Sequence, residues 1–258
     1  MPSAIEAFIV SGVFAFILTF VRIGSAVMIM PGLGDSFVPA RIRLHMGLAL
    51  TLALFPLLIP LMPSPIPGTL TLVTLIGMEF LIGIFFGTIA RILMTALDTA
   101  GMIISLQSGL ANAQLFNPSL ASQGSLMGAF LSVTGVVVLF TTNLHHLLIM
   151  GVLESYQLFP IGELPDTGSM AELMARAVST SFSIGFKIAA PFVVVTLLIY
   201  VGMGVLTRLM PQVQVFLLAL PLQILISLVT FTLVLSAGLM YWLGQFRDGM
   251  VFFLSFGG

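Results

Sequence analysis

Six long apolar segments dominate this chain and decide what it can fold into. They run over residues 4–30, 44–62, 69–106, 125–150, 175–207 and 213–244. Each is long enough to cross the ~30 Å hydrocarbon layer of a bilayer. The chain is 59% hydrophobic and 7% charged, with a mean hydropathy of +1.21. Since a backbone in lipid must satisfy its own hydrogen bonds, these segments predict an all-α integral membrane protein of long apolar helices.

The bounds of these segments lead to three further expectations. The segment 69–106 is too long for a simple span, so it either extends beyond the bilayer or breaks near Gly101. The segment 4–30 is too long for the apolar core of a signal peptide, so we expect it to be retained. Because proline cannot continue a helix, the prolines between residues 60 and 67 predict a short, rigid second connection.

Composition excludes several classes of function. A net charge of -1 gives no basic face for nucleic acid, and the absence of cysteine excludes disulfides and thiolate metal sites. The neighbours His145 and His146 point about 100° apart on a helix, which suits a shared metal poorly. We find no hydrolase elbow, zinc-protease motif or dinucleotide loop in the sequence. The sequence therefore predicts neither an enzyme nor a cofactor.

Five charged residues that lie well inside the apolar segments form the first candidate site. They are Arg22, Glu79, Arg91, Asp98 and Lys187. An ionisable group in hydrocarbon costs ~2.5–3.5 kcal/mol on insertion scales, so we expect these charges to be buried in pairs between helices. Glu79 and Arg91 lie about 18 Å apart along one helix and cannot pair with each other, so their partners must come from other segments or from other chains. Arg22 and Lys187 are the candidate cations for Glu79 and Asp98.

The same stretch also carries a packing motif. Gly83 and Gly87 have the spacing that lets membrane helices approach closely. Together with Glu79 and Arg91 they lie on one slowly drifting stripe of a helix. Two interpretations stay open: a purely structural seam, or a polar path that the protein uses.

The connection 107–124 differs from every other part of the chain. It is uncharged and rich in small polar residues, apart from the apolar pair Leu115-Phe116 before Asn117-Pro118. The Asn-Pro step predicts a turn. Irregular backbone at membrane depth survives only where it is buried in protein or lines water. We therefore expect residues 107–124 to be buried in protein or to line water, or else to form an exposed connection.

Charge asymmetry predicts an orientation. Six crossings put Arg41, Arg43 and Arg208 on one side and Glu154, Glu163, Asp166 and both termini on the other. The positive-inside rule makes the arginine side cytoplasmic. The brief connection after Arg208, with Pro211, Gln212 and Gln214, is then a cytoplasmic entrance.

Several blocks of the sequence, in order, resemble one known family. These are Arg22-x8-Pro31-Gly-Leu-Gly-x4-Pro39-Ala-Arg41-Ile-Arg43, Glu79-Phe-Leu-Ile-Gly83-x3-Gly87, Asp98-Thr-Ala-Gly101, Asn117-Pro118, Lys187-Ile-Ala-Ala-Pro191 and Arg208-Leu-Met-Pro211-Gln212-Val-Gln214-Val-Phe216. They cover nearly the whole chain and resemble the FliR family of flagellar export-gate proteins and their type III secretion counterparts.

The resemblance implies a subunit of the flagellar type III protein-export gate. In this family one such subunit joins FliP-like and FliQ-like subunits in a closed helical ring. The ring passes unfolded export substrates across the bacterial inner membrane, within the flagellar basal body. An FlhB-like export switch protein is a further expected partner. Residues 1–174 would be a FliP-like part and 175–258 a FliQ-like helical hairpin, in an assembly whose helices stand largely above the plane of the membrane.

The resemblance also assigns the unusual connection. It would be the plug that closes the channel, with Gln107, Leu110, Leu115, Phe116, Asn117 and Pro118 as its residues. The alternative function is a secondary transporter of small molecules, in which the intramembrane charges form the path. We find no inverted repeat that would support a transporter.

Overall fold

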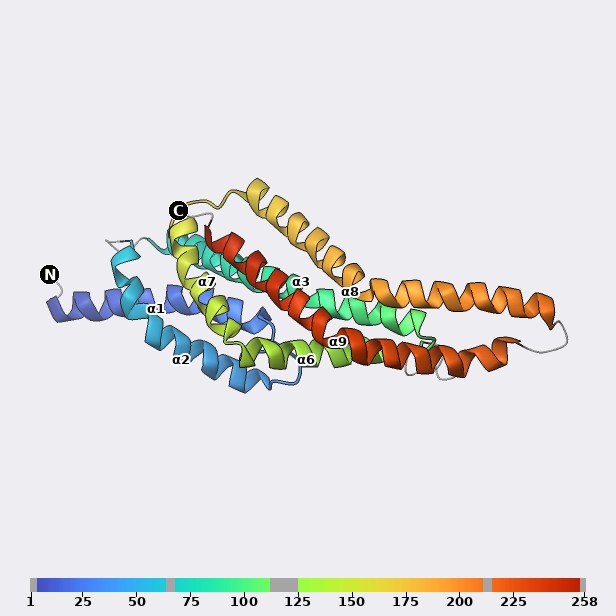
Figure 1. The fold of residues 1–258 in the computed structure, drawn as a ribbon. Helices are drawn as coiled ribbons and strands as arrows, with labels where there is room; N and C mark the ends of the chain where they lie inside the picture. Colours follow the sequence, from blue (N-terminus) through green and yellow to red (C-terminus); the bar gives the residue numbers. More distant parts are fainter. Residues whose placement is uncertain (1–3, 64–67, 112–124, 211–214, 256–258) are drawn as a thin grey trace. The chain divides into compact units, whose positions relative to one another are not determined.

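The computed structural model describes residues 4–63, 68–111, 125–210 and 215–255, and every regular element in these ranges is a helix. The helices are α1 (Ala4–Ile29), α2 (Ala40–Leu58), the 3-10 turn η1 (Ile59–Leu61), α3 (Thr69–Gln107), α6 (Leu126–Thr141), α7 (Leu144–Leu158), α8 (Thr167–Leu209) and α9 (Val215–Ser255), as Figure 1 shows. The predicted all-α class is confirmed.

Five helices are long and apolar enough to cross a membrane, or six spans if the bent pair α6 and α7 counts as one. Three helices exceed the length of a simple span: α3 has 39 residues, α8 has 43 and α9 has 41. At 1.5 Å per residue each is about 58–65 Å long. Helix α3 continues through Gly101, so the break that the sequence left open there does not occur.

The fourth apolar segment contains a bend that the sequence analysis did not predict. It is not one straight helix, because α6 and α7 meet at a bend of 78°. Asn143 starts α7 in the left-handed conformation, with φ 60°, as the one non-glycine residue with positive φ in the described ranges. Asparagine tolerates this conformation better than most residues. Hydropathy does not report backbone handedness, so the apolar run hides the bend.

The chain divides into two compact units that interleave along the sequence. The first contains residues 1–92, 143–177 and 248–258, and the second contains residues 93–142 and 178–247. These units do not follow the expected boundary between residues 174 and 175. That boundary rests on likeness to two other subunits and stays a prediction.

In the first unit, α1 packs against α2 and against the first half of α3. The rings of Phe16 on α1 and Phe55 on α2 meet edge to face, with their centroids 5.6 Å apart. A Cβ atom at Gly87 would lie 2.8 Å from the carbonyl oxygen of Ala26, and one at Gly83 would collide with Ser25. The two glycines therefore let α3 approach α1 at contact distance, as the spacing of the motif indicates.

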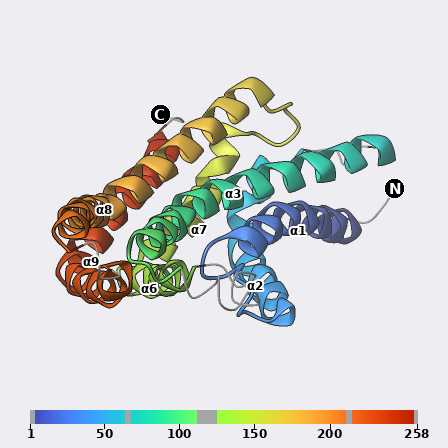
Figure 2. The ribbon, with the colours of Figure 1, turned by 90° about the vertical axis from the view of Figure 1, so that its right-hand side faces the viewer.

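In the second unit, the long antiparallel helices α8 and α9 pack side by side and contact the second half of α3 (Figure 2). Phe192 and Phe231 join α8 to α9, with ring centroids 6.3 Å apart. Trp242 is fully buried, and its indole N–H donates to the carbonyl of Leu93 at 3.2 Å.

Asp166 directly precedes α8. Its carboxylate accepts hydrogen bonds that lower its pKa, chiefly from the Ser169 hydroxyl and then from the Gly168 N–H.

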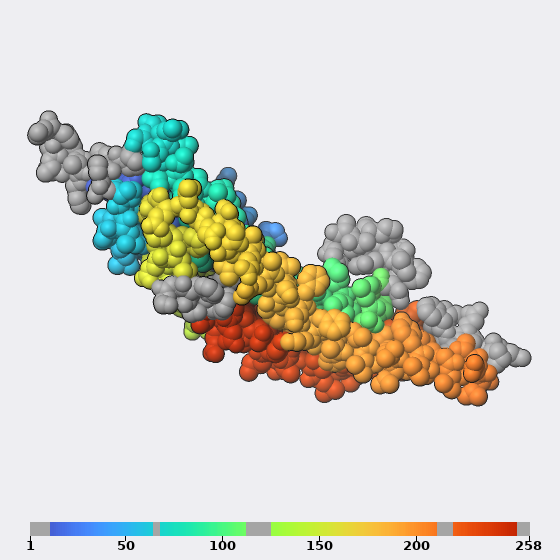
Figure 3. All heavy atoms as spheres, turned by 90° about the horizontal axis from the view of Figure 1, so that it is seen from above, coloured from blue at the N-terminus to red at the C-terminus, as the bar shows by residue number. Residues whose placement is uncertain are grey.

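Much apolar surface of α8 and α9 is left uncovered by the rest of the described residues. Of the most apolar stretch of α9 only 6% is buried, and of α8 only 22%. Leu198 on α8 is 66% exposed and Leu233 on α9 is 76% exposed. Figure 3 shows the C-terminal half of α8, in orange, at the surface. Such surface is stable only against lipid or against other apolar helices.

We expect Gly101→Ala to destabilise the chain and Gly77→Ala, in the same helix, to leave it unchanged or slightly more stable. A Cβ at Gly101 would collide with the backbone of Gly128 on α6, whereas a Cβ at Gly77 meets no atom within 4 Å. Overpacking of this kind costs about 1–3 kcal/mol. Thermal unfolding of both variants in detergent measures the difference. Equal melting temperatures would contradict the close contact of α3 with α6.

Candidate functional site

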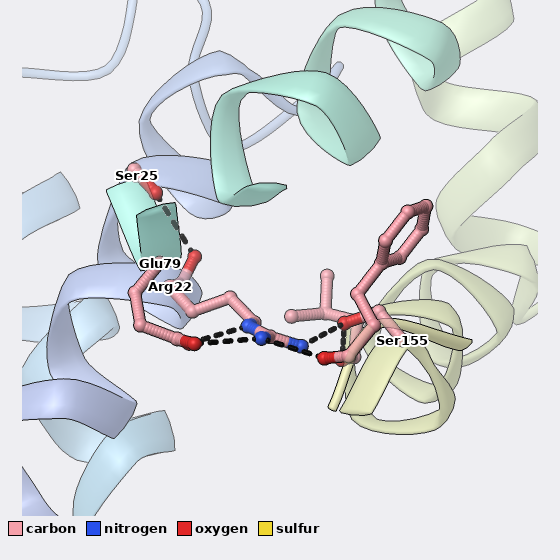
Figure 4. A network of polar contacts seen from close by, with 6 residues as sticks. Arg22, Ser25, Glu79 and Ser155 are labelled. Carbon is pink, nitrogen blue, oxygen red and sulfur yellow. Dashed lines mark hydrogen bonds and ion pairs between the residues drawn. The ribbon is translucent and has the colours of Figure 1, made fainter. Parts of the chain in front are cut away.

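Arg22 on α1 and Glu79 on α3 form a buried ion pair (Figure 4). Arg22 Nε lies 2.5 Å from Glu79 Oε2, and Arg22 Nη2 lies 2.8 Å from Oε1. The contact is bidentate, the strongest geometry available to a guanidinium and a carboxylate. Both residues are inaccessible, at 0% and 1% exposure. The pair that the sequence suggested for these two charges is therefore present.

Helix α7 completes the surroundings of Arg22. Arg22 Nη1 donates to Ser155 Oγ at 3.3 Å, and Nη2 donates to the carbonyl of Phe159 at 3.0 Å. The guanidinium carbon lies 3.9 Å from the centroid of the Tyr156 ring, a cation–π contact. The cation thus has partners on both of its terminal nitrogens and on one face.

Local sequence brings the two charges together. Gly83 lies one turn after Glu79, and its missing side chain leaves room for the carbonyl of Arg22 and for Ser25. Ser25 Oγ donates to that carbonyl at 3.0 Å. Close approach of α3 to α1 then brings the Glu79 carboxylate within reach of the guanidinium. The contacts of Arg22 join the three helices α1, α3 and α7. Both carboxylate oxygens of Glu79 are bound to Arg22, so neither is left without a partner for a substrate to bind.

Arg91 makes a second ion pair, with a residue that the sequence analysis did not consider. Arg91 Nη1 lies 2.6 Å from Oδ1 of Asp35, in the connection between α1 and α2. Asp35 Oδ2 also accepts the N–H of Gly32 at 2.7 Å, and Gly32 has φ 81°. The Arg91 side chain is 38% exposed, so this pair is half-buried. The pair fastens α3 to the turn after α1, and Arg91 Nη1 also donates to the carbonyl of Ile29, the last residue of α1, at 3.4 Å.

Asp98 and Lys187, unlike Arg22 and Glu79, are exposed among the described residues, so their expected burial against a partner stays a prediction. Ser132 on α6 donates to Asp98 Oδ1. The Lys187 ammonium lies 5.9 Å from the centroid of the Tyr241 ring on α9. Among the described residues neither charge has an oppositely charged partner. Each lies on an exposed face of its helix, so its burial would require residues other than the described ones.

The predicted plug and entrance lie only partly within the described residues. Gln107 ends α3, and its carbonyl accepts hydrogen bonds from Thr196 and Gln223. Leu110 follows Gly109, which has φ 79°. Arg208 lies in the exposed last turn of α8. The residues outside the described ranges are Leu115, Phe116, Asn117, Pro118, Pro211, Gln212 and Gln214.

Sequence reasoning missed the uncharged partners at these sites. Ser155, Tyr156, Thr196 and Gln223 are all buried, at 5% exposure or less. Gln223 stands alone in an apolar run, and a lone polar residue there is typical of a helix face turned toward the bundle. Within the described ranges no group of three or more His, Cys, Asp or Glu residues is arranged to hold a metal ion.

Comparison with known proteins gives consistent matches over most of the chain. Residues 13–249 match the family described as "Bacterial export proteins, family 1". The chain is 39% identical to flagellar biosynthetic protein FliR of Caulobacter vibrioides, over 92% of this chain and 94% of that protein. FliR of Bacillus subtilis is 30% identical over 86% of each chain. Yop proteins translocation protein T of Yersinia pestis is 32% identical over 59% of each chain.

We expect Glu79→Leu to destabilise the chain strongly. Removing one partner of a buried ion pair leaves the other charge uncompensated, at a cost of ~3–5 kcal/mol. Thermal unfolding in detergent measures the loss. The control is Glu172→Leu, which breaks an exposed pair with Arg176, 2.5 Å long, on α8. An exposed pair of this spacing contributes only about 0.3–0.5 kcal/mol.

A second variant tests the cause of that loss. Arg22→Met combined with Glu79→Leu removes both charges, so it should recover much of the stability that Glu79→Leu loses. If the double variant is no more stable than the single one, the uncompensated charge is not the reason for the loss.

Proposed function

The chain belongs to family 1 of the bacterial export proteins, and from this premise we propose a subunit of the flagellar type III protein-export apparatus. It would help to pass unfolded export substrates across the bacterial inner membrane, without modifying them. The observation that carries this proposal is the match to flagellar biosynthetic protein FliR over nearly the full length of both proteins. The match to Yop proteins translocation protein T extends the same role to type III secretion.

The uncovered faces of α8 and α9 support an assembly with other membrane subunits. These helices bury little of their apolar length within the chain, and Lys187 lies among their exposed apolar residues. An exposed ammonium on an apolar helix is costly in lipid, by ~2.5–3.5 kcal/mol, and is relieved by a polar neighbour. We propose FliP-like and FliQ-like subunits as those neighbours, with an FlhB-like protein at the cytoplasmic rim.

A secondary transporter is not favoured by the geometry of the charges. In a transporter the intramembrane groups face a water-filled site that opens to each side in turn. Arg22 and Glu79 instead lie in a buried network in which every guanidinium nitrogen donates a hydrogen bond and both carboxylate oxygens accept one. Arg91 is committed to Asp35. The charges therefore act in this proposal as fasteners between helices.

Plug deletion tests the role of the connection 107–124. We propose that this connection closes the channel, with Phe116 and Leu115 sealing by apolar contact. Deleting residues 114–118 should leave assembly intact and let ions leak across the inner membrane, measured as slowed growth and increased conductance on overexpression with the partner subunits. A second variant replaces residues 114–118 by a Gly-Ser stretch of the same length. It keeps the length of the connection but removes the apolar seal, so it should leak as well. Normal export without added leak in both variants would leave the connection as a mere linker.

Thiol labelling tests the proposed orientation. The chain has no cysteine, so a single introduced one reacts without background. Cysteine at Gln212, in the entrance connection, should react with an impermeant thiol reagent only from the cytoplasmic face. Cysteine at Glu163, in the acidic connection, is the matched control and should react only from the outside of spheroplasts. The opposite pattern at the two positions would reverse the orientation.

A further inference from the structure

The end of α3 poses a hydrogen-bonding problem in an apolar protein. The last four carbonyl groups of an α-helix have no partner within the helix. Helix α3 ends at Gln107, and Gly109 then turns the chain with φ 79°. An unsatisfied carbonyl costs several kcal/mol where water is absent. Something other than solvent must therefore bind the carbonyl oxygens at this end.

Two side chains from two other helices solve this problem at one atom. The Gln107 carbonyl oxygen accepts Thr196 Oγ1 on α8 at 2.8 Å and Gln223 Nε2 on α9 at 2.6 Å. Both side chains belong to buried residues, at 1% and 5% exposure. A carbonyl oxygen has two lone pairs, and here each has its own donor. The end of α3 is thus hydrogen-bonded to both arms of the α8–α9 hairpin.

The start of α6 is fastened to the same end of α3. Ser125 caps α6 by accepting the N–H of Gly128 at 3.0 Å. Its hydroxyl donates to the carbonyl of Gly101 on α3 at 2.9 Å. Since that proton is committed, the hydroxyl of Ser105, 2.7 Å away, donates to Ser125 Oγ. Both sides of the connection between α3 and α6 are therefore tied by polar contacts to the last two turns of α3.

We propose that Thr196 and Gln223 are positioning residues that fix the C-terminal end of α3 against the α8–α9 hairpin. We call this pair, with the Gln107 carbonyl, the stem clamp. Apolar contacts between these helices are non-directional and allow sliding. The two hydrogen bonds are directional, so they select one register of the hairpin along α3. We also expect loss of the stem clamp to let ions leak through the channel. This second expectation rests on the proposed function of the connection that starts at Gln107.

The test compares local opening at the end of α3 in matched variants of the full chain. Thr196→Val and Gln223→Leu each remove one donor at nearly constant volume. Thr196→Ser keeps the hydroxyl and serves as the conservative rescue. Thr230→Val on α9 is the control, because the Thr230 hydroxyl donates only within its own helix, to Ile226 at 2.8 Å. Amide hydrogen exchange is followed in a peptide spanning residues 104–111.

Each lost hydrogen bond contributes roughly 0.5–1.5 kcal/mol, so the double variant should exchange about fivefold faster or more in this peptide. Exchange in peptides from α1 and α2 should not change, and Thr196→Ser and Thr230→Val should match the parent chain. Unchanged exchange at 104–111 would overturn the clamp, as would an equal increase throughout the chain. If the double variant does not fold, the single variants give the same comparison with a smaller increase.

Ion leak in cells separates the clamp from the function it serves. Faster local exchange together with increased leak supports both. Faster local exchange without leak supports the clamp and contradicts a closing role for the connection. Leak without a change in local exchange contradicts the clamp, because the variants would then act through some other contact.

Discussion

The buried pair of Arg22 and Glu79 is the interaction on which the first unit depends. Neither charge can stay in apolar surroundings without the other, so α1 and α3 are stable there only in the register that brings both together. Glycine at position 83 makes that register possible, because any side chain there would collide with α1. Ser155 and Tyr156 on α7 also contact Arg22, so α7 too must pack in the position that brings them to the guanidinium. A single ion pair thus specifies the packing of three helices whose apolar surfaces carry little directional information.

The same physical rule operates at the ends and turns of helices. Asp35 binds Arg91 and the Gly32 N–H, which fixes the turn between α1 and α2 onto α3. Thr196 and Gln223 bind the last carbonyl of α3, and Ser125 caps the start of α6. In water each of these groups would have a solvent partner at little cost. In an apolar bundle each must find a protein partner, so a few polar residues determine where long apolar helices meet.

The sequence predicts the helices well and their partners only in part. Apolar length and the demand for internal hydrogen bonds fix the helical class, and the charges inside apolar runs correctly point to Arg22 and Glu79 as a pair. The bend at Asn143 is hidden because it depends on one backbone angle within a run of uniform hydropathy. Asp35 was overlooked because it lies in a connection. Thr196 and Gln223 act on a backbone carbonyl, and no side-chain pattern marks which carbonyl a helix end leaves open.

Asp98 and Lys187 are two charges whose place on apolar helices the contacts within the described chain do not explain. Both are charged residues on long apolar helices, and both are exposed, whereas Arg22 and Glu79 are sealed inside. Burial among the described residues therefore separates the charges that hold the helices of this chain together from the charges that stay exposed. The apolar faces of α8 and α9 are likewise left exposed, and they resemble the interior of a helical bundle whose other helices are missing. A subunit of a larger export apparatus can carry such surfaces, because neighbouring subunits complete the core that its own helices begin.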